Sequence, residues 1–112
     1  MKVGVDIEKI RRFKDSCQDQ HFISSIFTEK EVEYCQGKKE PYISFTGKFC
    51  AKEAVIKATS KNLRMKDIEI LHHPSGEIKV LIKGEEDQAI KCSISHTDDY
   101  AVSFVVIEDY RI

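Results

Sequence analysis

The chain has 112 residues, of which 33% are charged, and a formal net charge of -1. This balance gives no general basic field for nucleic acid, and the sequence shows neither a signal peptide nor an apolar run long enough to span a bilayer. We therefore expect a single cytoplasmic domain over residues 1–112, with no nucleic-acid or membrane partner, whose small core favours a homo-oligomer.

The chain opens with a predicted strand and helix. Residues 2–7 alternate as a strand does, and Asp6 lies on the face opposite the apolar residues. The apolar residues are Val3, Val5 and Ile7. A helix is expected next, over about residues 10–22.

Two further helices are expected between residues 28 and 60. Thr28 precedes Glu31 by three residues, a capping-box pattern that predicts a helix ending near Gln36. Polar residues 36–41 then predict a loop. A long central helix is expected over about residues 42–60.

The second half of the chain has strand-like periodicity. Residues 68–71 and 78–82 predict a hairpin, because a turn-forming segment with proline and glycine separates them. A polar connector with one helical turn is expected over 84–88, followed by strands over 90–96 and 100–108. With helices before strands and no strand-helix-strand repeat, we expect an α+β fold, with a mainly antiparallel sheet packed on the long central helix.

The central helix contains the segment FTGKFCAKEAVIK, in which Glu53 and Lys57 stand one turn apart. A glutamate among apolar residues can be a metal ligand, or it can form an ordinary surface pair with the lysine four residues later. Three lysines of this helix could meet phosphate oxygens, or a desolvated one could accept a proton, although solvated lysines are the commoner case. They are Lys48, Lys52 and Lys57.

Asp6 departs from its local pattern as Glu53 does, as an acid among apolar residues in a regular element. If both point into one cleft, their oxygens could hold Mg²⁺ while water and substrate phosphates complete the octahedron. The alternative is that Asp6 is a strand-end residue satisfied by backbone amides.

Hydroxyl and imidazole groups lie at the end of the strand predicted over residues 90–96. Ser95, His96 and Thr97 would suit hydrogen bonding to a phosphate or a ribose, although a histidine at a strand end is often only a surface residue. His72 and His73 precede Pro74 and are interpreted as turn residues.

Four segments, in this order, resemble one family over nearly the whole chain: GVDIEKI, FTEKE, KFCAKEAVIKA and SISHT. The family is the holo-acyl-carrier-protein synthase group of 4'-phosphopantetheinyl transferases, in its short single-domain form. The resemblance implies transfer of 4'-phosphopantetheine from coenzyme A to a serine of an apo acyl carrier protein, with release of adenosine 3',5'-bisphosphate. It leaves open whether the carrier serves fatty-acid or polyketide-type synthesis.

The resemblance also implies roles for individual residues. Asp6 and Glu53 match the acids that bind Mg²⁺, and Lys57 matches a lysine that helps to deprotonate or position the serine. His96 and Thr97 match residues near the 3'-phosphate or adenosine of coenzyme A. To these cosubstrate contacts we add Lys52 and Ser95 from their positions in the sequence.

For docking of the acidic carrier, Arg12 matches the basic position of the family, and Arg11 is added because it is adjacent and exposed at the start of the first helix. The family resemblance further implies a homotrimer with active sites at subunit junctions. His96 and Lys48 would then serve a site whose acids come from a neighbouring chain.

The chain departs from the family pattern at three places. Lys48 replaces an arginine that grips phosphate with two donors, which predicts weaker coenzyme A binding. A usual glycine is missing from KATSKNL after the central helix, and Glu77 replaces a proline after the hairpin glycine. These changes leave the metal acids and Lys57 in place.

Two other functions remain open from sequence. One is a carrier-binding or assembly module with the same fold and no turnover. The other is a cysteine and histidine metal module, which the lack of paired ligand spacing disfavours. The four cysteines are expected to be free thiols, some of them buried: Cys17, Cys35, Cys50 and Cys92.

Overall fold

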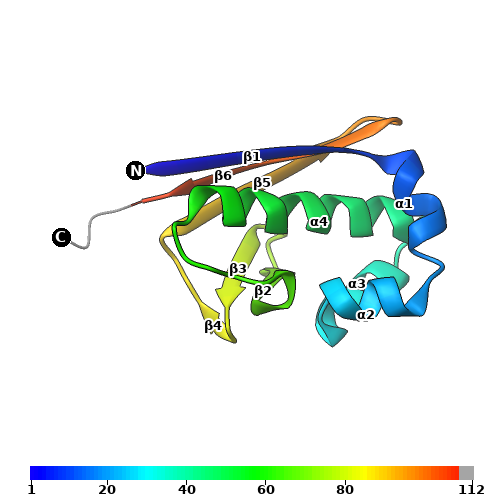
Figure 1. Ribbon diagram of the computed structural model, residues 1–112, viewed down its shortest axis with the longest axis horizontal. Helices are drawn as coiled ribbons and strands as arrows, with labels where there is room; N and C mark the ends of the chain where they lie inside the picture. The colour runs from blue at the N-terminus through cyan, green and yellow to red at the C-terminus, as the bar shows by residue number, and fades with distance from the viewer. Residues whose placement is uncertain (109–112) are drawn as a thin grey trace.

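The computed structural model describes residues 1–108, and it has the expected α+β architecture. An antiparallel sheet has the strand order β1-β6-β5, formed by Lys2–Lys9, Tyr100–Ile107 and Ile90–His96. The long helix α4, Pro41–Ala58, runs along one face of this sheet (Figure 1). This arrangement confirms the predicted long helix and terminal strands.

Two short helices replace the single helix expected over residues 10–22. The prediction of one continuous helix was therefore wrong. Helix α1 spans Ile10–Ser16 and α2 spans Gln20–Ile26. The break occurs because Asp19 adopts an extended conformation and caps α2, its side chain accepting hydrogen bonds from the amides of His21 and Phe22. Asp19, one of the polar residues between the two helices, therefore marks the start of a new helix.

The capping box predicted at Thr28 and Glu31 is present, and it opens α3, Glu29–Gln36. The predicted hairpin is also confirmed, since β2, Ile68–His72, pairs antiparallel with β3, Ile78–Ile82. The structure corrects the helical turn expected over residues 84–88, where a short strand β4, Glu85–Glu86, pairs with β3. These strands form a second sheet, preceded by a short 3-10 helix, Met65–Asp67.

Strand β1 lies unusually close to α4. A Cβ on Gly4 would stand 2.1 Å from the carbonyl oxygen of Ala54, so only glycine permits this approach. The small residues of the helix, including Ala51, are fully buried against the sheet. The close approach brings the next inward-facing residue of β1, Asp6, against the same helix.

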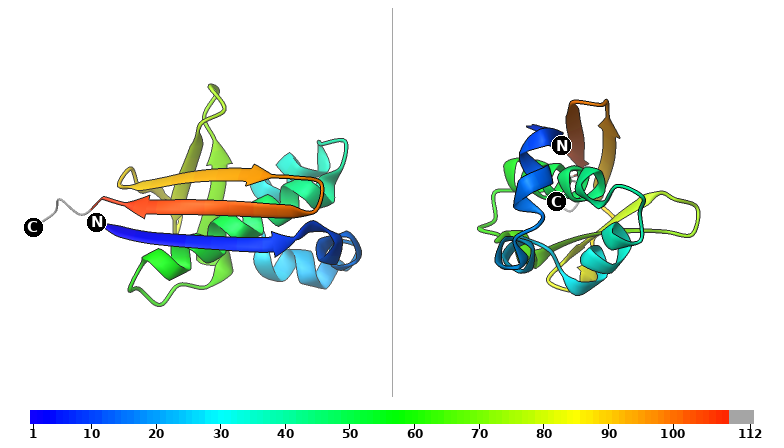
Figure 2. Two further views of the ribbon diagram at one scale, coloured as in Figure 1. Left: turned by 90° about the horizontal axis from the view of Figure 1, so that it is seen from above. Right: turned by 90° about the vertical axis from the view of Figure 1, so that its right-hand side faces the viewer.

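The opposite face of the first sheet carries exposed apolar side chains. Val5 is 53% exposed and pairs across the sheet with Phe104, which is 49% exposed. Val3 and Ile7 flank Val5 on this face and are also exposed. Figure 2 shows the three strands side by side with no other element over this face. The apolar face predicted for residues 2–7 is therefore outside the core.

Candidate active site

Asp6 and Lys57 meet between β1 and the last turn of α4. The ammonium of Lys57 donates to Asp6 Oδ1 at 3.0 Å and to the carbonyl oxygen of Val5 at 3.0 Å. The other carboxylate oxygen, Asp6 Oδ2, is buried and has no hydrogen-bond partner within the protein. Lys57 thus pairs with Asp6 rather than with Glu53, against the ordinary surface pair considered from sequence.

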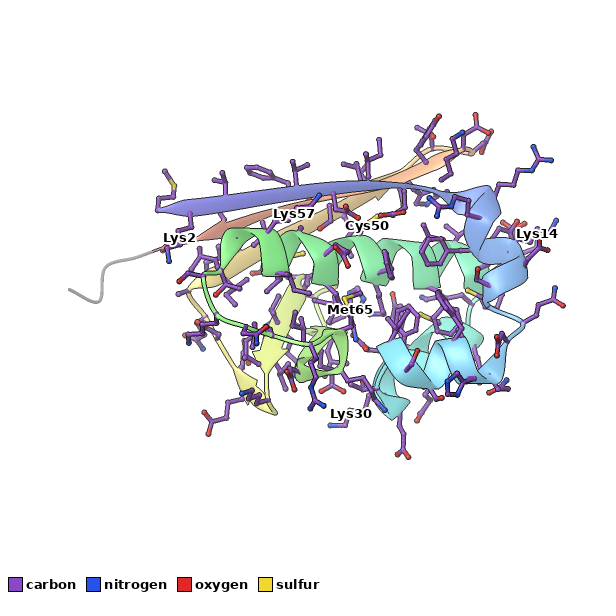
Figure 3. All side chains as sticks on the ribbon, in the orientation of Figure 1. Lys2, Lys14, Lys30, Cys50, Lys57 and Met65 are labelled. Atoms are coloured by element: carbon purple, nitrogen blue, oxygen red, sulfur yellow. The ribbon has the colours of Figure 1, made fainter. Side chains whose placement is uncertain are left out.

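Two further carboxylates lie near Asp6, and we call Asp6, Glu8 and Glu53 the acid cluster. Burial, the neighbouring Asp6 and, more weakly, the charge of Glu53 together raise the pKa of Glu8 to about 7. The Asp6 carboxylate also raises the pKa of Lys57, so that this side chain is an ammonium at neutral pH. In Figure 3 the side chain of Lys57 lies between α4 and the first sheet.

Sequence analysis missed Glu8. Because strand residues alternate, Glu8 follows Gly4 and Asp6 on the face that meets α4, and this alternation was the available signal. Cys50 of α4 lies beside these acids, is fully buried and donates to the carbonyl oxygen of Ala101 at 3.4 Å. Burial raises its pKa to about 12, so it is an inert thiol.

The acid cluster has the chemistry of a magnesium site. Mg²⁺ prefers hard oxygen ligands and commonly takes one or two carboxylates, with substrate phosphates and water in the remaining positions. Asp6 Oδ2 is a buried oxygen without a protein donor, and Glu53 of α4 is close enough to Glu8 and Lys57 for its charge to raise the pKa of both. Over residues 1–108, no three or more histidine, cysteine or acidic side chains are grouped to hold a metal alone. The acid cluster therefore fits a cation that takes part of its ligands from the protein and the rest from a bound phosphate and water.

Lys48 and His96 lie together, on the other side of α4. Both line a cavity of about 270 Å³, which we call the histidine pocket and which also contains His72 and Ser44. His96 is separated from Glu8 by Ala101, since Glu8, Ala101 and His96 are aligned across the three strands. One chain therefore presents the acid cluster and the histidine pocket on opposite flanks of the central helix.

The structure corrects the expectation that Lys52 contacts the cosubstrate. Its side chain is 0% exposed and its ammonium lies 2.6 Å from Oε1 of Glu31, which is also 0% exposed. It further donates to the carbonyl oxygens of Ile26 and Met65. With all its donors used inside the protein, Lys52 cannot reach a phosphate.

Ser95 and Thr97 are also placed differently from His96. Ser95 pairs with Val102, so its side chain is on the outer face of the sheet, whereas His96 is on the inner face. The hydroxyl of Thr97 accepts hydrogen bonds from the amides of Asp99 and Tyr100, and so stabilises the β5-β6 turn. Only His96 of this group lines the pocket.

Arg11 and Arg12 are both exposed on α1, directly after β1. The guanidinium of Arg12 partly offsets the rise in the pKa of Glu8 that burial and Asp6 cause, which places its charge near the acid cluster. The four cysteines are free, as expected, and two of them are buried. Among residues 1–108, no helix combines the length and apolar character needed to cross a membrane.

A family model described as the 4'-phosphopantetheinyl transferase superfamily matches residues 2–105. The holo-[acyl-carrier-protein] synthase of Caldanaerobacter subterraneus subsp. tengcongensis is 40% identical over 93% of this chain and 91% of its own length. The holo-[acyl-carrier-protein] synthase of Thermodesulfovibrio yellowstonii is 40% identical over 94% of this chain and 96% of its own length.

The crystal structure of a holo-(acyl-carrier-protein) synthase from Bacillus anthracis, in complex with CoA (3',5'-ADP), shares the fold. Its TM-score is 0.81 at 27% identity, covering 95% of this chain and 94% of that one. The crystal structure of the Neisseria meningitidis synthase has the same fold, with a TM-score of 0.82 at 24% identity over 96% of this chain and 98% of that one. The chain therefore belongs to the holo-[acyl-carrier-protein] synthase family of the 4'-phosphopantetheinyl transferase superfamily.

Proposed function

We propose that the protein transfers 4'-phosphopantetheine from coenzyme A to a serine hydroxyl of an apo acyl carrier protein, with Mg²⁺, releasing adenosine 3',5'-bisphosphate. The observation that carries this proposal is the buried, unpartnered Asp6 Oδ2, whose companion oxygen pairs with Lys57 and whose neighbours Glu8 and Lys57 feel the charge of Glu53. Family membership supports the class of reaction, and Asp6 Oδ2 is an oxygen that could bind the cation used in such a reaction.

Asp6 and Glu53 would hold the metal, which, when bound, would polarise the diphosphate and lower the negative charge that repels the attacking serine. Lys57 is held in place by two oxygens and carries a positive charge. We therefore assign it to positioning the serine and stabilising phosphoryl charge, in preference to removing the proton. Lys48 and His96 would line the site of the nucleotide end of coenzyme A.

The acidic carrier is proposed to dock on α1. Arg11 and Arg12 are exposed there, and Arg12 lies near the acid cluster, so a carrier bound to them would hold its serine close to Asp6. The separation of the histidine pocket from the acid cluster by α4 supports a site shared between subunits.

We further propose a homotrimer whose subunits meet through the exposed apolar face of the first sheet. An apolar patch on a small domain marks an interaction surface, and Val5 and Phe104 form its centre. Such an interface would bring the histidine pocket of one subunit to the acid cluster of the next, and it would extend the limited core of the 112-residue chain.

Replacing Phe104 by glutamate is expected to dissociate the trimer, because a charge would be buried at the centre of an apolar contact. Size-exclusion chromatography with light scattering measures the mass directly. The control Ser24→Glu, on the exposed side of α2, should keep the wild-type mass. A Phe104→Glu variant of unchanged mass would place the subunit contact elsewhere.

Intact-mass spectrometry of an apo carrier tests the proposed reaction. Incubation with the protein, coenzyme A and Mg²⁺ is expected to add one 4'-phosphopantetheine to the carrier, and chelation of the metal should stop the gain. Several apo carriers from fatty-acid and polyketide-type systems should be compared. The absence of any mass gain with all of them would refute the proposal.

A further inference from the structure

Tyr34, Lys48 and His72 form a compact cluster at the histidine pocket. The rings of Tyr34 and His72 are stacked, with centroids 4.4 Å apart and an interplanar angle of 17°. The ammonium of Lys48 lies 4.3 Å from the centroid of the Tyr34 ring and 3.2 Å from His72 Nε2. Three elements, α3, α4 and β2, thus hold two flat rings around one cation.

The hydrogen bonds of this cluster fix the state of His72. Burial lowers the pKa of Lys48. With Lys48 as an ammonium, which has only donors, Nε2 of His72 accepts from it, and the ring proton is on Nδ1, which faces the carbonyl oxygen of Gly76 at 3.4 Å. Burial and the Lys48 charge lower the pKa of His72. His72 is therefore a neutral ring whose two nitrogens are occupied by the protein.

Lys48 is equally occupied. Its ammonium donates to the carbonyl oxygen of Ile70 at 2.6 Å, contacts His72, and faces the Tyr34 ring, and the residue is only 2% exposed. It contributes positive charge to the pocket rather than a free donor. The Tyr34 ring is stacked on His72 and also has the ammonium of Lys38 4.5 Å from its centroid, so what the cluster can offer a ligand is the ring surface of His72.

The stacked pair is shared by two cavities. Tyr34 and His72 line the histidine pocket, and both also line an adjoining cavity of about 730 Å³. Three lysines line that second cavity: Lys30, Lys38 and Lys79. An aromatic surface with ammonium groups on one side fits a ligand that combines a flat ring with phosphates.

We propose that the Tyr34–His72 pair, braced by Lys48, is the surface on which the purine base of the cosubstrate stacks. The inference deepens the proposed function and rests on it. It makes His72 a residue that determines affinity for the nucleotide end of coenzyme A, with Tyr34 and Lys48 positioning its ring. The nucleotide site would still be lined by Lys48 and His96, and the lysines of the second cavity would add positive charge on the other side of the rings.

Isothermal titration calorimetry with adenosine 3',5'-bisphosphate tests this role. His72→Ala is expected to weaken binding about 10-fold, a typical loss for one base-stacking ring. His72→Phe should retain most of the affinity, because it keeps a flat ring while losing both nitrogens. The matched control is His73→Ala, since His73 is adjacent and pairs with Glu86 outside the stack.

Steady-state transfer assays should show the same pattern. His72→Ala should raise KM for coenzyme A about 10-fold and leave kcat and the KM for the carrier within about twofold. Binding of ribose 3,5-bisphosphate, which lacks the base, should not depend on His72. Thermal unfolding of each variant identifies any loss of folded protein.

The inference is overturned if His72→Ala and His73→Ala bind alike, or if His72→Phe is as weak as His72→Ala. In the second case His72 would act through its nitrogens and not through its ring surface. A wild-type protein that binds the nucleotide in this way but modifies no carrier would contradict the proposed function alone. Wild-type protein that transfers the arm normally while His72 has no effect would contradict only the stacking surface.

Discussion

Lys52→Met is expected to destabilise the protein by about 3–5 kcal/mol, the usual cost of leaving one member of a buried ion pair alone. The ammonium of Lys52 lies 2.6 Å from Oε1 of Glu31, and both side chains have zero exposure. Glu31 also accepts hydrogen bonds from the amides of Thr28 and Ile70. The pair therefore connects α3, α4 and β2, and methionine would leave a buried carboxylate without its counter-charge.

Urea unfolding followed by circular dichroism, at pH 7 and a fixed subunit concentration, measures this loss. The double variant Lys52→Met/Glu31→Gln should recover part of it, because a neutral amide can still accept a backbone hydrogen bond. Lys30→Met removes an exposed lysine of α3 and should change stability by about 0.5 kcal/mol or less. A loss below about 1 kcal/mol for Lys52→Met would mean that water reaches the pair.

The Glu31–Lys52 pair also shows where sequence analysis succeeded and where it failed. The capping box at Thr28 is a local pattern, and its helix was predicted correctly. Lys52 looked like a phosphate ligand because nothing within its own helix indicates a partner. Its partner is 21 positions earlier in the sequence, in another helix, and only the tertiary fold brings the two together.

The first sheet gives a similar contrast. Alternation over residues 2–7 predicted the opposite orientations of Val5 and Asp6 correctly. It did not indicate that Val5 would be exposed, since alternation shows that the two faces of a strand differ but not which face meets the helix. The stack of Tyr34 on His72 was equally out of reach, because His72 was interpreted as a turn residue and lies at the end of β2. Local sequence patterns do not reveal which distant segments of the chain contact each other.

Asp6→Asn is expected to lower kcat for phosphopantetheinyl transfer by at least about 100-fold, because it removes one of the two proposed metal oxygens and the charge that holds Lys57. The control Asp98→Asn changes an exposed acid of the β5-β6 turn in the same way and should keep wild-type activity. Carrier modification measured by intact mass over time gives both rates.

The same substitution should change the stability of the fold very little. Asp6 Oδ2 is buried without a partner, and burial together with the Asp6 charge raises the pKa of Glu8 to about 7. Asparagine removes that charge, so the pKa of Glu8 should fall, as carboxyl NMR would show. The ion pair that is lost involves an ammonium that is 53% exposed, which limits its contribution to about 1 kcal/mol or less.

Asp6→Asn should therefore unfold at nearly the wild-type temperature while losing activity. Mg²⁺ should raise the melting temperature of the wild type, by mass action on the folded state, and should leave that of Asp6→Asn unchanged. If Mg²⁺ stabilises both proteins equally, the cation binds away from Asp6. If Asp6→Asn loses activity only because it unfolds, Asp6 is a structural residue and the buried oxygen has no catalytic meaning.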